Sequence, residues 1–523
     1  MIGEIAIDGH SLNLEQIERV AYEEATVTLD PEARRRVEAS RRTIERAIGR
    51  GASVYGVNTG FGRFSDVVIP PEDVARLQRN LIVSHAAGVG EPFPVPVVRA
   101  MLLLRANALA IGHSGVRPVV IETLIGMLNR RVHPVVPQKG SLGASGDLAP
   151  LAHLTLVALG LGEAFDGDRR VRGAEAMAAA GLTPLVLEAK EGLALINGTQ
   201  AMTAVAALTL AKARRLAILA DAAGALSLEA LRGIPEAYDP RLQAARGHPG
   251  QAVSARLVRE LLEGSRLVTR PGQLRTQDAY ALRCLPQVHG ASRDAIDYAV
   301  GVVLREANAA TDNPLIFAED EAVISGGNFH GQPVALAMDF AGMALAEFGS
   351  ISERRIERLV NPQLSGLPAF LTRQGGLNSG LMLAQYTAAA LVSEDKLLAS
   401  PASVDSIPSS ANQEDHVSMG TIAARKAAEI LANVETILAI ELLCAAQAVD
   451  LAVEGLGGGA ARSPADYLGR GTRVIYEAVR SRVPGLEEDR VLADDIETIR
   501  REMTAGRDQS WWAAAGITPP GAE

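Results

Sequence analysis

The segment Gln138–Pro150 is the part of the chain whose residue types and spacing could most directly do chemistry. It carries three glycines at a spacing of three, which free the backbone to adopt conformations closed to other residues. Asp147 is a favoured N-cap and Pro150 is tolerated in a first turn, so the sequence predicts a helix over Leu148–Leu161. A bent small-residue loop would then meet a helix N-terminus, where the backbone dipole stabilises negative charge.

Three common functions of such a loop can be compared with its sequence. A phosphate-binding loop needs the Gly-Lys-Ser/Thr ending of a P-loop or the dinucleotide pattern Gly-x-Gly-x-x-Gly, and neither is present here. A nucleophile elbow reads Gly-x-Ser-x-Gly, whereas Gly146 follows Ser145 directly. A plain structural turn stays open as an interpretation.

A fourth interpretation uses the tripeptide Ala144–Gly146 itself. Glycine has an unhindered amide nitrogen, which in a bent backbone can attack the carbonyl carbon two residues back. Loss of one water closes a five-membered ring, and loss of the serine hydroxyl as a second water leaves an exocyclic methylidene group. The product would be an electrophile made from the chain alone, so the rest of the sequence must supply a substrate site.

The composition limits the class of protein. Of 523 residues, 48% are hydrophobic, 21% are charged and only 4% are aromatic, which favours helices buried on several sides. The net charge of −10 argues against a nucleic-acid surface, and two cysteines imply no disulfide framework. The N-terminus lacks a signal pattern, and the apolar run 437–453 is interrupted by Glu441 and Asp450. We therefore expect a soluble cytoplasmic protein with no nucleic-acid or membrane partner.

Long helical patterns dominate the chain after about residue 199. Patterns above about 25 residues indicate a coiled coil, a membrane span or a long bundle. No strict heptad holds and charges interrupt the patterns, so we expect a mainly α, long-helix bundle. The expected long helices cover 199–231, 292–310, 333–359 and 418–454, and shorter ones cover 34–50, 72–84, 93–112 and 118–130.

Three consecutive regions are expected. Residues 1–200 would form a smaller, mixed N-terminal region that carries the loop, and 201–460 would form the central bundle. Residues 461–523 would form a C-terminal helical tail, in which Trp511 and Trp512 serve as a docking anchor.

Four loops before helices are unusually rich in amide and ionisable side chains, which is a plausible way for a helix bundle to build a site. In one of them, Gln277, Tyr280 and Arg283 are three residues apart, so one helical face could hold all three. The four loops are Ile196–Gln200, Gln277–Cys284, Gly326–His330 and Ser410–His416.

Together these segments resemble the histidine and aromatic amino-acid ammonia-lyase family over about residues 4 to 500. Gly143–Asp147 matches the family's self-cyclising loop, which implies that Ala144, Ser145 and Gly146 form a 4-methylidene-imidazol-5-one group without an external cofactor. The resemblance also implies a fumarase/aspartase-like helical core and a homotetramer whose sites combine loops from different subunits. Other matching segments are Tyr55–Gly62, Ser84–Gly90, Asn197–Gln200, Gln277–Arg283, Asn308–Pro314, Gly326–Gln332 and Ser409–Met419.

Within the family, two segments resemble the members that act on histidine: Ser84–His85 and Asn412–His416. An imidazole has one donor and one acceptor nitrogen, which a polar pair such as His85 and Glu414 would suit. The resemblance thus implies elimination of ammonia from L-histidine to give trans-urocanate, the first step of histidine degradation. A tyrosine or phenylalanine ammonia-lyase or aminomutase is the alternative within enzymes, and a helical scaffold with an inert loop is the alternative outside them.

The resemblance also implies roles for individual residues. Tyr55 and Tyr280 are the candidates for the base that removes the β-proton, and Arg283 would bind the substrate carboxylate. Glu414 could bind the imidazole or take part in proton transfer. No spacing suggests a metal site. The remaining residues are His85, Asn197, Gln277 and Phe329 for substrate binding, with Asn313 and Gln413 in support.

Overall fold

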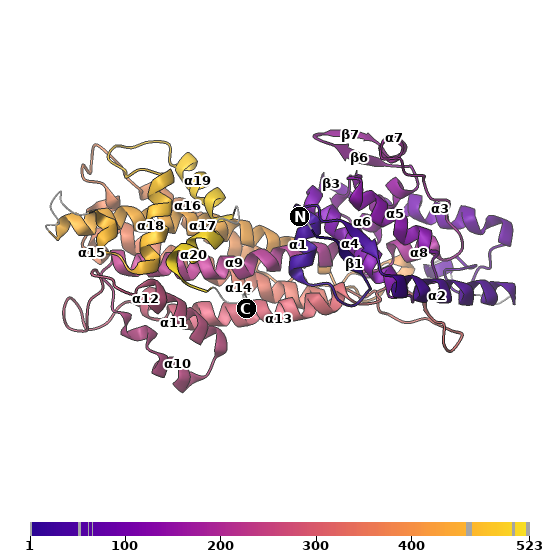
Figure 1. Ribbon diagram of the computed structural model, residues 1–523, viewed down its shortest axis with the longest axis horizontal. Coiled ribbons are helices and arrows are strands. Elements are labelled where there is room, and N and C mark those ends of the chain that lie inside the picture. Colours follow the sequence, from indigo (N-terminus) through magenta and orange to yellow (C-terminus); the bar gives the residue numbers. More distant parts are fainter. Residues whose placement is uncertain are drawn as a thin grey trace. The chain divides into compact units, whose positions relative to one another are not determined.

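The computed structural model describes residues 3–50, 54–60, 62–64, 66–456, 463–504 and 508–518. The side chains of Arg63 and of residues 508–510 are not described. Phe61 of the Tyr55–Gly62 segment and the expected boundary at residue 461 lie outside the described residues. The described chain is mainly helical with a few short strands (Figure 1), which confirms the expected fold class.

Two compact units divide the chain, and each combines segments that are distant in sequence. Unit 1 comprises residues 1–211, 299–339 and 401–426, and unit 2 comprises 212–298, 340–400 and 427–523. The three consecutive regions expected above stay a prediction. Both units contain parts of the four long helices, α9 (Gln200–Ala230), α13 (Leu285–Ala307), α14 (Gln332–Val360) and α17 (Gly420–Gly455).

The long helices confirm the sequence expectation closely. Three of them begin and end within two residues of the predicted bounds. The exception is α13, which begins at Leu285 instead of residue 292, because the Leu285–Gly290 stretch continues the same helix.

Unit 1 contains the shorter helices of the N-terminal part and the described strands. A parallel pair joins β1 to β2, antiparallel pairs join β3 to β5 and β8 to β9, and β4–β6–β7 form a three-stranded sheet. In Figure 1, α7 lies beside the β6–β7 hairpin, against which it packs. The strands are β1 (Ile5–Ile7), β2 (Val27–Leu29), β3 (Val89–Pro92), β4 (His133–Pro134), β5 (Pro137–Lys139), β6 (Glu163–Asp166), β7 (Arg169–Arg172), β8 (Leu315–Phe317) and β9 (Ala322–Ile324).

The helices of unit 1 follow from ordinary local signals. Asn13 and Gln16 form a capping box at α1, and Asp30 accepts hydrogen bonds from the first turn of α2, which carries proline at its first position. Their bounds are α1 (Leu14–Tyr22), α2 (Pro31–Gly49), α3 (Val74–His85), α4 (Val95–Ala110), α5 (Pro118–Asn129), α6 (Leu148–Ala158), α7 (Gly173–Ala179) and α8 (Glu191–Ile196), with short 3-10 turns at Gly62–Phe64, Pro71–Asp73 and Ser410–Asn412.

The core of unit 1 surrounds α4, whose residues from Val98 to Ala110 are all buried. A helix that is buried on every side is a core helix. Helices α3, α6 and α8 pack against one another beside it. These three helices and the loops at their ends carry five of the thirteen candidate site residues: His85, Ala144, Ser145, Gly146 and Asn197.

Unit 2 consists of helices among its described residues. The expected anchor is confirmed, because the Trp511 and Trp512 side chains in α20 are buried and α20 packs against α18. The helices other than the long ones are α10 (Pro240–Arg246), α11 (Pro249–Leu261), α12 (Tyr280–Arg283), α15 (Pro362–Ser365), α16 (Met382–Leu398), α18 (Arg470–Arg482), α19 (Leu492–Thr504) and α20 (Asp508–Ala515), with 3-10 turns at Pro235–Tyr238, Ala369–Leu371 and Pro464–Tyr467.

Two helices, α14 and α17, are long and apolar enough to cross a membrane by length and composition. Their most apolar windows have mean hydropathies of 1.4 and 1.8, but 67% and 89% of those windows are buried inside the protein. Burial of this extent is typical of the core helices of a bundle, so length and hydropathy alone are weak evidence that these helices cross a membrane.

A buried ion pair joins α14 to α17 within unit 2. Arg355 donates to Glu441 through Nε at 2.5 Å and Nη2 at 2.8 Å, and neither side chain is exposed. The hydroxyls of Ser227 on α9 and Ser352 on α14 donate to the two carboxylate oxygens at 2.7 and 2.6 Å. Complete hydrogen bonding of this kind is what makes a buried charge tolerable.

Replacing Arg355 by methionine should therefore destabilise the protein strongly, because Glu441 would keep a buried charge without its partner. We expect a loss of about 3–5 kcal/mol, seen as a lower thermal unfolding midpoint in circular dichroism. The double variant R355M/E441L should recover much of the loss. Arg241→Met is the matched control, since the Arg241 side chain is 90% exposed and its removal should change little. Equal midpoints for R355M and wild type would contradict this reasoning.

Candidate active site

A cavity of about 1160 Å³ in unit 1 holds most of the predicted site residues. Its wall is built from the turn at Tyr55, the end of α3, the loop before α6, the end of α8 and the loops at 325–330 and 410–416. The predicted residues that line it are Tyr55, His85, Ala144, Ser145, Asn197, Asn313, Phe329, Gln413 and Glu414.

Two glycines of the 140–147 loop are required by close contacts and by positive φ angles. Gly146 has φ +71°, and a Cβ on it would lie 2.2 Å from the Gly198 carbonyl oxygen. Gly143 has φ +65°, and a Cβ on it would lie 2.2 Å from Oγ of Ser418. Only glycine fits at both positions. The loop is therefore bent and held from two sides, as ring closure between adjacent peptide units would need.

The structure corrects the expected role of Asp147. It occupies the N-cap position of α6, but its side chain does not cap that helix. Instead Oδ2 accepts the backbone N–H of Met202 at 2.7 Å, in the first turn of α9, while Oδ1 accepts from Ser141 at 2.8 Å and from Thr421. Complete burial raises the pKa of Asp147, against the hydrogen bonds that lower it. The carboxylate thus ties the loop to a second helix.

The carbonyl of Ser145 faces a fixed donor. Nδ2 of Asn197 donates to this oxygen at 3.0 Å, and Asn197 is 3% exposed. The carbonyl of Asn197 in turn accepts from Nη1 of Arg105 at 3.0 Å. A Cβ on Gly198 would lie 2.3 Å from that same nitrogen, so the missing side chain lets the guanidinium reach the backbone.

Sequence reasoning missed Arg105, a fully buried residue of α4. Nη1 also donates to Gln200 at 2.6 Å, whereas Nε and Nη2 have no hydrogen-bond partner among the described residues. Burial lowers the pKa of Arg105 to about 10, so the group stays charged at neutral pH. The available signal was a cation in the middle of an apolar helix pattern, where an unpaired charge is costly.

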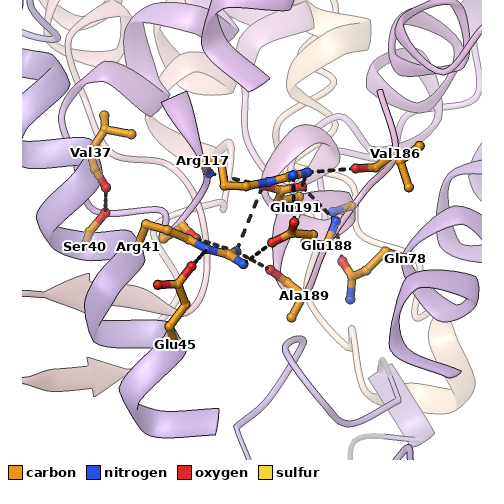
Figure 2. Close-up of polar contacts among 12 residues, drawn as sticks. Val37, Ser40, Arg41, Glu45, Gln78, Arg117, Val186, Glu188, Ala189 and Glu191 are labelled. Carbon is orange, nitrogen blue, oxygen red and sulfur yellow. Dashed lines mark hydrogen bonds and ion pairs between the residues drawn. The ribbon is translucent and has the colours of Figure 1, made fainter. Parts of the chain in front are cut away.

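The N-terminus of α8, which leads to Asn197, is held by a cluster of ion pairs (Figure 2). Glu191, whose side chain is not exposed, accepts from Nε and Nη2 of Arg117 at 2.8 and 2.7 Å. Arg41 on α2 donates to the Glu188 carboxylate at 2.5 Å and to the Ala189 carbonyl at 3.1 Å. The cluster fixes the direction in which α8 approaches the cavity.

Gln78 on α3 links α8 to the turn that carries Tyr55, and sequence reasoning missed it too. Its side chain is fully buried; Oε1 accepts the Gly192 N–H at 2.8 Å, and Nε2 donates to the Gly56 carbonyl at 3.4 Å. A glutamine inside a short amphipathic helix gives no sequence signal for such a contact.

Glu414 lies directly against the loop. Oγ of Ser145 donates to Oε1 at 3.0 Å, and Oγ of Ser409 donates to Oε2 at 3.0 Å. The residues between Ser409 and Gln413 all have left-handed φ values of 52–67°, which non-glycine residues adopt at a cost. That strained turn places the carboxylate at the loop, 269 residues away in sequence.

His85 lies at the end of α3, and its ring contacts Ser84. Oγ of Ser84 donates to the Leu81 carbonyl at 3.1 Å and lies 3.0 Å from Nδ1 of His85. A hydroxyl has one proton, so Nδ1 must donate to Oγ and Nε2 is left as an acceptor. Burial lowers the pKa of His85, although the nearby Glu414 charge raises it.

Tyr55 is buried enough for its phenol to resist ionisation. Burial raises its pKa and the charge of Glu414 adds to this, while the Gly62 N–H, which donates to Oη at 3.4 Å, opposes it. A phenolate at Tyr55 would therefore need a positive charge close by.

Gln277, Tyr280 and Arg283 belong to unit 2 and are not among the lining residues. The expected shared helical face is wrong for Gln277, because α12 begins only at Tyr280. Tyr280 is 70% exposed, and the guanidinium carbon of Arg283 lies 4.7 Å from its ring centroid. Nε of Arg283 has no hydrogen-bond partner among the described residues. The described lining residues include no lysine or arginine.

The Asn197 amide and the 140–147 loop suit a methylidene-imidazolone group better than a metal ion. The Asn197 amide points at the carbonyl that would become part of the ring, and Gly146 has the unhindered nitrogen that closure needs. No cluster of three or more His, Cys, Asp or Glu side chains that could hold a metal ion occurs among the described residues.

Comparison with known proteins gives a consistent picture. The pattern of the family described as "Aromatic amino acid lyase" matches residues 12–481. The chain is similar to the histidine ammonia-lyase of Symbiobacterium thermophilum, with 60% identity over 94% of this chain and 95% of that protein. Its fold is similar to histidine ammonia-lyase from Trypanosoma cruzi, with a TM-score of 0.89, 42% identity and coverage of 98% and 96%. It is also similar to the tyrosine aminomutase of Streptomyces globisporus, with a TM-score of 0.93, 40% identity and coverage of 99% and 100%.

Gly146→Ala should disrupt the loop, because its Cβ would meet the Gly198 carbonyl at 2.2 Å and its φ of +71° disfavours any side chain. We expect a loss of at least about 1–2 kcal/mol in thermal unfolding, with faster proteolysis between residues 139 and 147. Gly327→Ala is the control, since nothing lies within 4 Å of the added carbon and its effect should stay within about 0.5 kcal/mol. Identical behaviour of the two variants would show that the Gly146 contact does not constrain the loop.

Proposed function

The chain belongs to the aromatic amino acid lyase family, and we propose that its reaction is the elimination of ammonia from L-histidine to give trans-urocanate. The observation that carries the proposal is the position of Glu414 and His85 in one cavity with Ser145 of the loop. Tyrosine or phenylalanine elimination or amino-group migration is the second candidate, supported by the fold similarity to the aminomutase. The higher identity to histidine ammonia-lyases favours histidine.

The group proposed for the loop is 4-methylidene-imidazol-5-one, formed from Ala144, Ser145 and Gly146 with no external cofactor. Once formed, it supplies an electrophilic carbon that makes the amine of the substrate a better leaving group. Asn197 would hold a hydrogen bond to the ring carbonyl, which comes from Ser145, where negative charge develops. Arg105 would position Asn197 and add a positive charge behind it.

Recognition of the imidazole would rest on His85 and Glu414. Nε2 of His85 is an acceptor, so it would take the N–H of the substrate ring. The Glu414 carboxylate at the cavity would favour a cationic amine or ring. A phenyl ring would desolvate the same polar groups without pairing them, at a cost of about 1–3 kcal/mol for each buried group. Phe329, Asn313 and Gln413 would complete the wall as supporting residues.

The base that removes the β-proton would be Tyr55 or Tyr280. For Tyr55, whose pKa is raised by burial and by the charge of Glu414, the positive amine of the substrate or Arg283 must offset both effects. Tyr280 already lies against Arg283. Arg283 would also bind the substrate carboxylate, because guanidinium groups pair bidentately with carboxylates.

The proposed assembly is a cytoplasmic homotetramer whose sites are shared between subunits. It is supported by the absence of lysine and arginine from the described lining residues, since a second chain would have to bring Gln277, Tyr280 and Arg283 to the cavity. It is also supported by large apolar side chains on the surface of unit 2, where Tyr298, Phe340 and Tyr386 are 55%, 45% and 58% exposed. Such side chains are typical of subunit contacts.

Ser145→Ala tests the function at its centre. The variant should fold and assemble as the wild type does but lose nearly all turnover, because the methylidene carbon comes from Ser145 Cβ. Urocanate formation from L-histidine is followed by absorbance. L-Phenylalanine and L-tyrosine are tested separately as alternative substrates. Mass spectrometry of the wild-type peptide that contains Ala144–Gly146 should show a mass lower by two waters. Wild-type activity in S145A, or an unmodified wild-type peptide, would refute the proposal.

The pH dependence of His85 gives a second test. Because burial lowers its pKa, the ring should stay neutral as the pH falls through about 6.5, the usual value. We expect the ratio of kcat/KM between wild type and His85→Gln to fall as the pH is lowered, with a midpoint below about 6.5. Taking the ratio cancels the titration of the free substrate. A decline with its midpoint at or above 6.5 would contradict a neutral His85.

A further inference from the structure

The hydroxyl of Ser145 is the group that must leave as the second water, and it donates its hydrogen bond to Glu414 at 3.0 Å. We propose that Glu414 also matures the loop, by carrying the proton that lets this hydroxyl depart. The inference rests on the proposed function, since it assumes that the loop cyclises. It gives Glu414 a task before any substrate enters.

The atoms balance without an oxidant or a co-reactant. In the first step the nitrogen of Gly146 bonds to the carbonyl carbon of Ala144, and the oxygen of that carbonyl leaves as water with protons from the two amide nitrogens of Ser145 and Gly146. In the second step the Cα–H and Cβ–Oγ bonds of Ser145 break and a carbon–carbon double bond forms. Glu414 takes the α-proton and returns a proton to Oγ, so it ends in the state in which it began.

The position of Glu414 suits this transfer. Oε1 contacts Oγ of Ser145, while the Ser409 hydroxyl holds Oε2 and the antiparallel bridge between Ser409 and Glu414 fixes the backbone. The carboxylate therefore has one oxygen anchored and one at the leaving group. General acid–base catalysis requires this hydrogen-bond distance.

Other acids near the loop are committed elsewhere. Asp147 is fully buried and accepts from Ser141, Met202 and Thr421. Glu306 accepts from Thr199. Asp415 lines the same cavity and is the neighbour of Glu414 in sequence, so it serves as a matched control for the loss of one carboxylate charge.

The test follows maturation and does not depend on turnover. Wild type, Glu414→Gln and Asp415→Asn are made as full chains by cell-free synthesis, sampled over time, digested, and weighed at the peptide that contains Ala144–Gly146. We expect wild type and D415N to lose two waters at the same rate. E414Q should accumulate a peptide lighter by one water, and the second loss should be slowed about 10²-fold or more. Glu414→Asp, which keeps a carboxyl group, should lose the second water at an intermediate rate.

Each outcome decides the matter. Loss of both waters by E414Q at the wild-type rate overturns the inference and leaves the proposed function intact. An unmodified E414Q peptide, in a chain whose circular dichroism and elution match wild type, also overturns it, because Glu414 would then position the loop for ring closure. If E414Q does not fold, E414D decides. Loss of the second water by E414D at the wild-type rate overturns the inference. A slower loss, with accumulation of the peptide that has lost one water, supports it. An unmodified wild-type peptide would instead refute the proposed function.

Discussion

The close approach of two backbones at Gly146 and Gly198 is the contact on which the site depends. A parallel bridge joins these residues, and the Asp147 N–H donates to the Gly198 carbonyl at 2.7 Å. Neither residue has room for a Cβ: one on Gly146 would collide with the Gly198 backbone, and one on Gly198 would collide with the side chains of Arg105 and Gln200. The contact brings the Ser145 carbonyl to the Asn197 amide and leaves space on the other side of Gly198 for Arg105.

In unit 1, two helix N-termini are capped by side chains that are distant in sequence. Asp147 caps α9 and Gln78 caps α8, and each of these side chains comes from a segment that also borders the cavity. An exposed N–H at a helix end must find a partner, and a partner from another segment fixes the two segments relative to each other. The 140–147 loop and α3 are thus each held by the N-terminus of a helix that they do not directly precede, α9 and α8 respectively.

The sequence predicted the long helices well, since apolar periodicity over 25 residues or more leaves few alternatives. Nine of the predicted site residues line the cavity, and four of them, Asn197, Phe329, Gln413 and Glu414, come from loops that were recognisable by their polar content. It could not predict partners: Asp147 looked like a local cap, and only the folded chain shows that its carboxylate reaches Met202. Gln277 was placed on a helix by its spacing, but spacing does not tell where a four-residue helix begins. Arg105 and Gln78 escaped notice because their partners are far away in sequence. Arg105 contacts Asn197, more than 90 residues away, and Gln78 contacts Gly192 in α8, more than 110 residues away.

The depth of Arg105 has a consequence for the medium in which the protein works. Surface pairs such as Arg34 and Glu122, whose side chains are 44% and 43% exposed, weaken as ionic strength rises. Arg105 is not exposed to solvent, so mobile ions cannot gather around it. Salt therefore screens the electric field that Arg105 sets up at Asn197 and the loop much less than it screens the surface pairs.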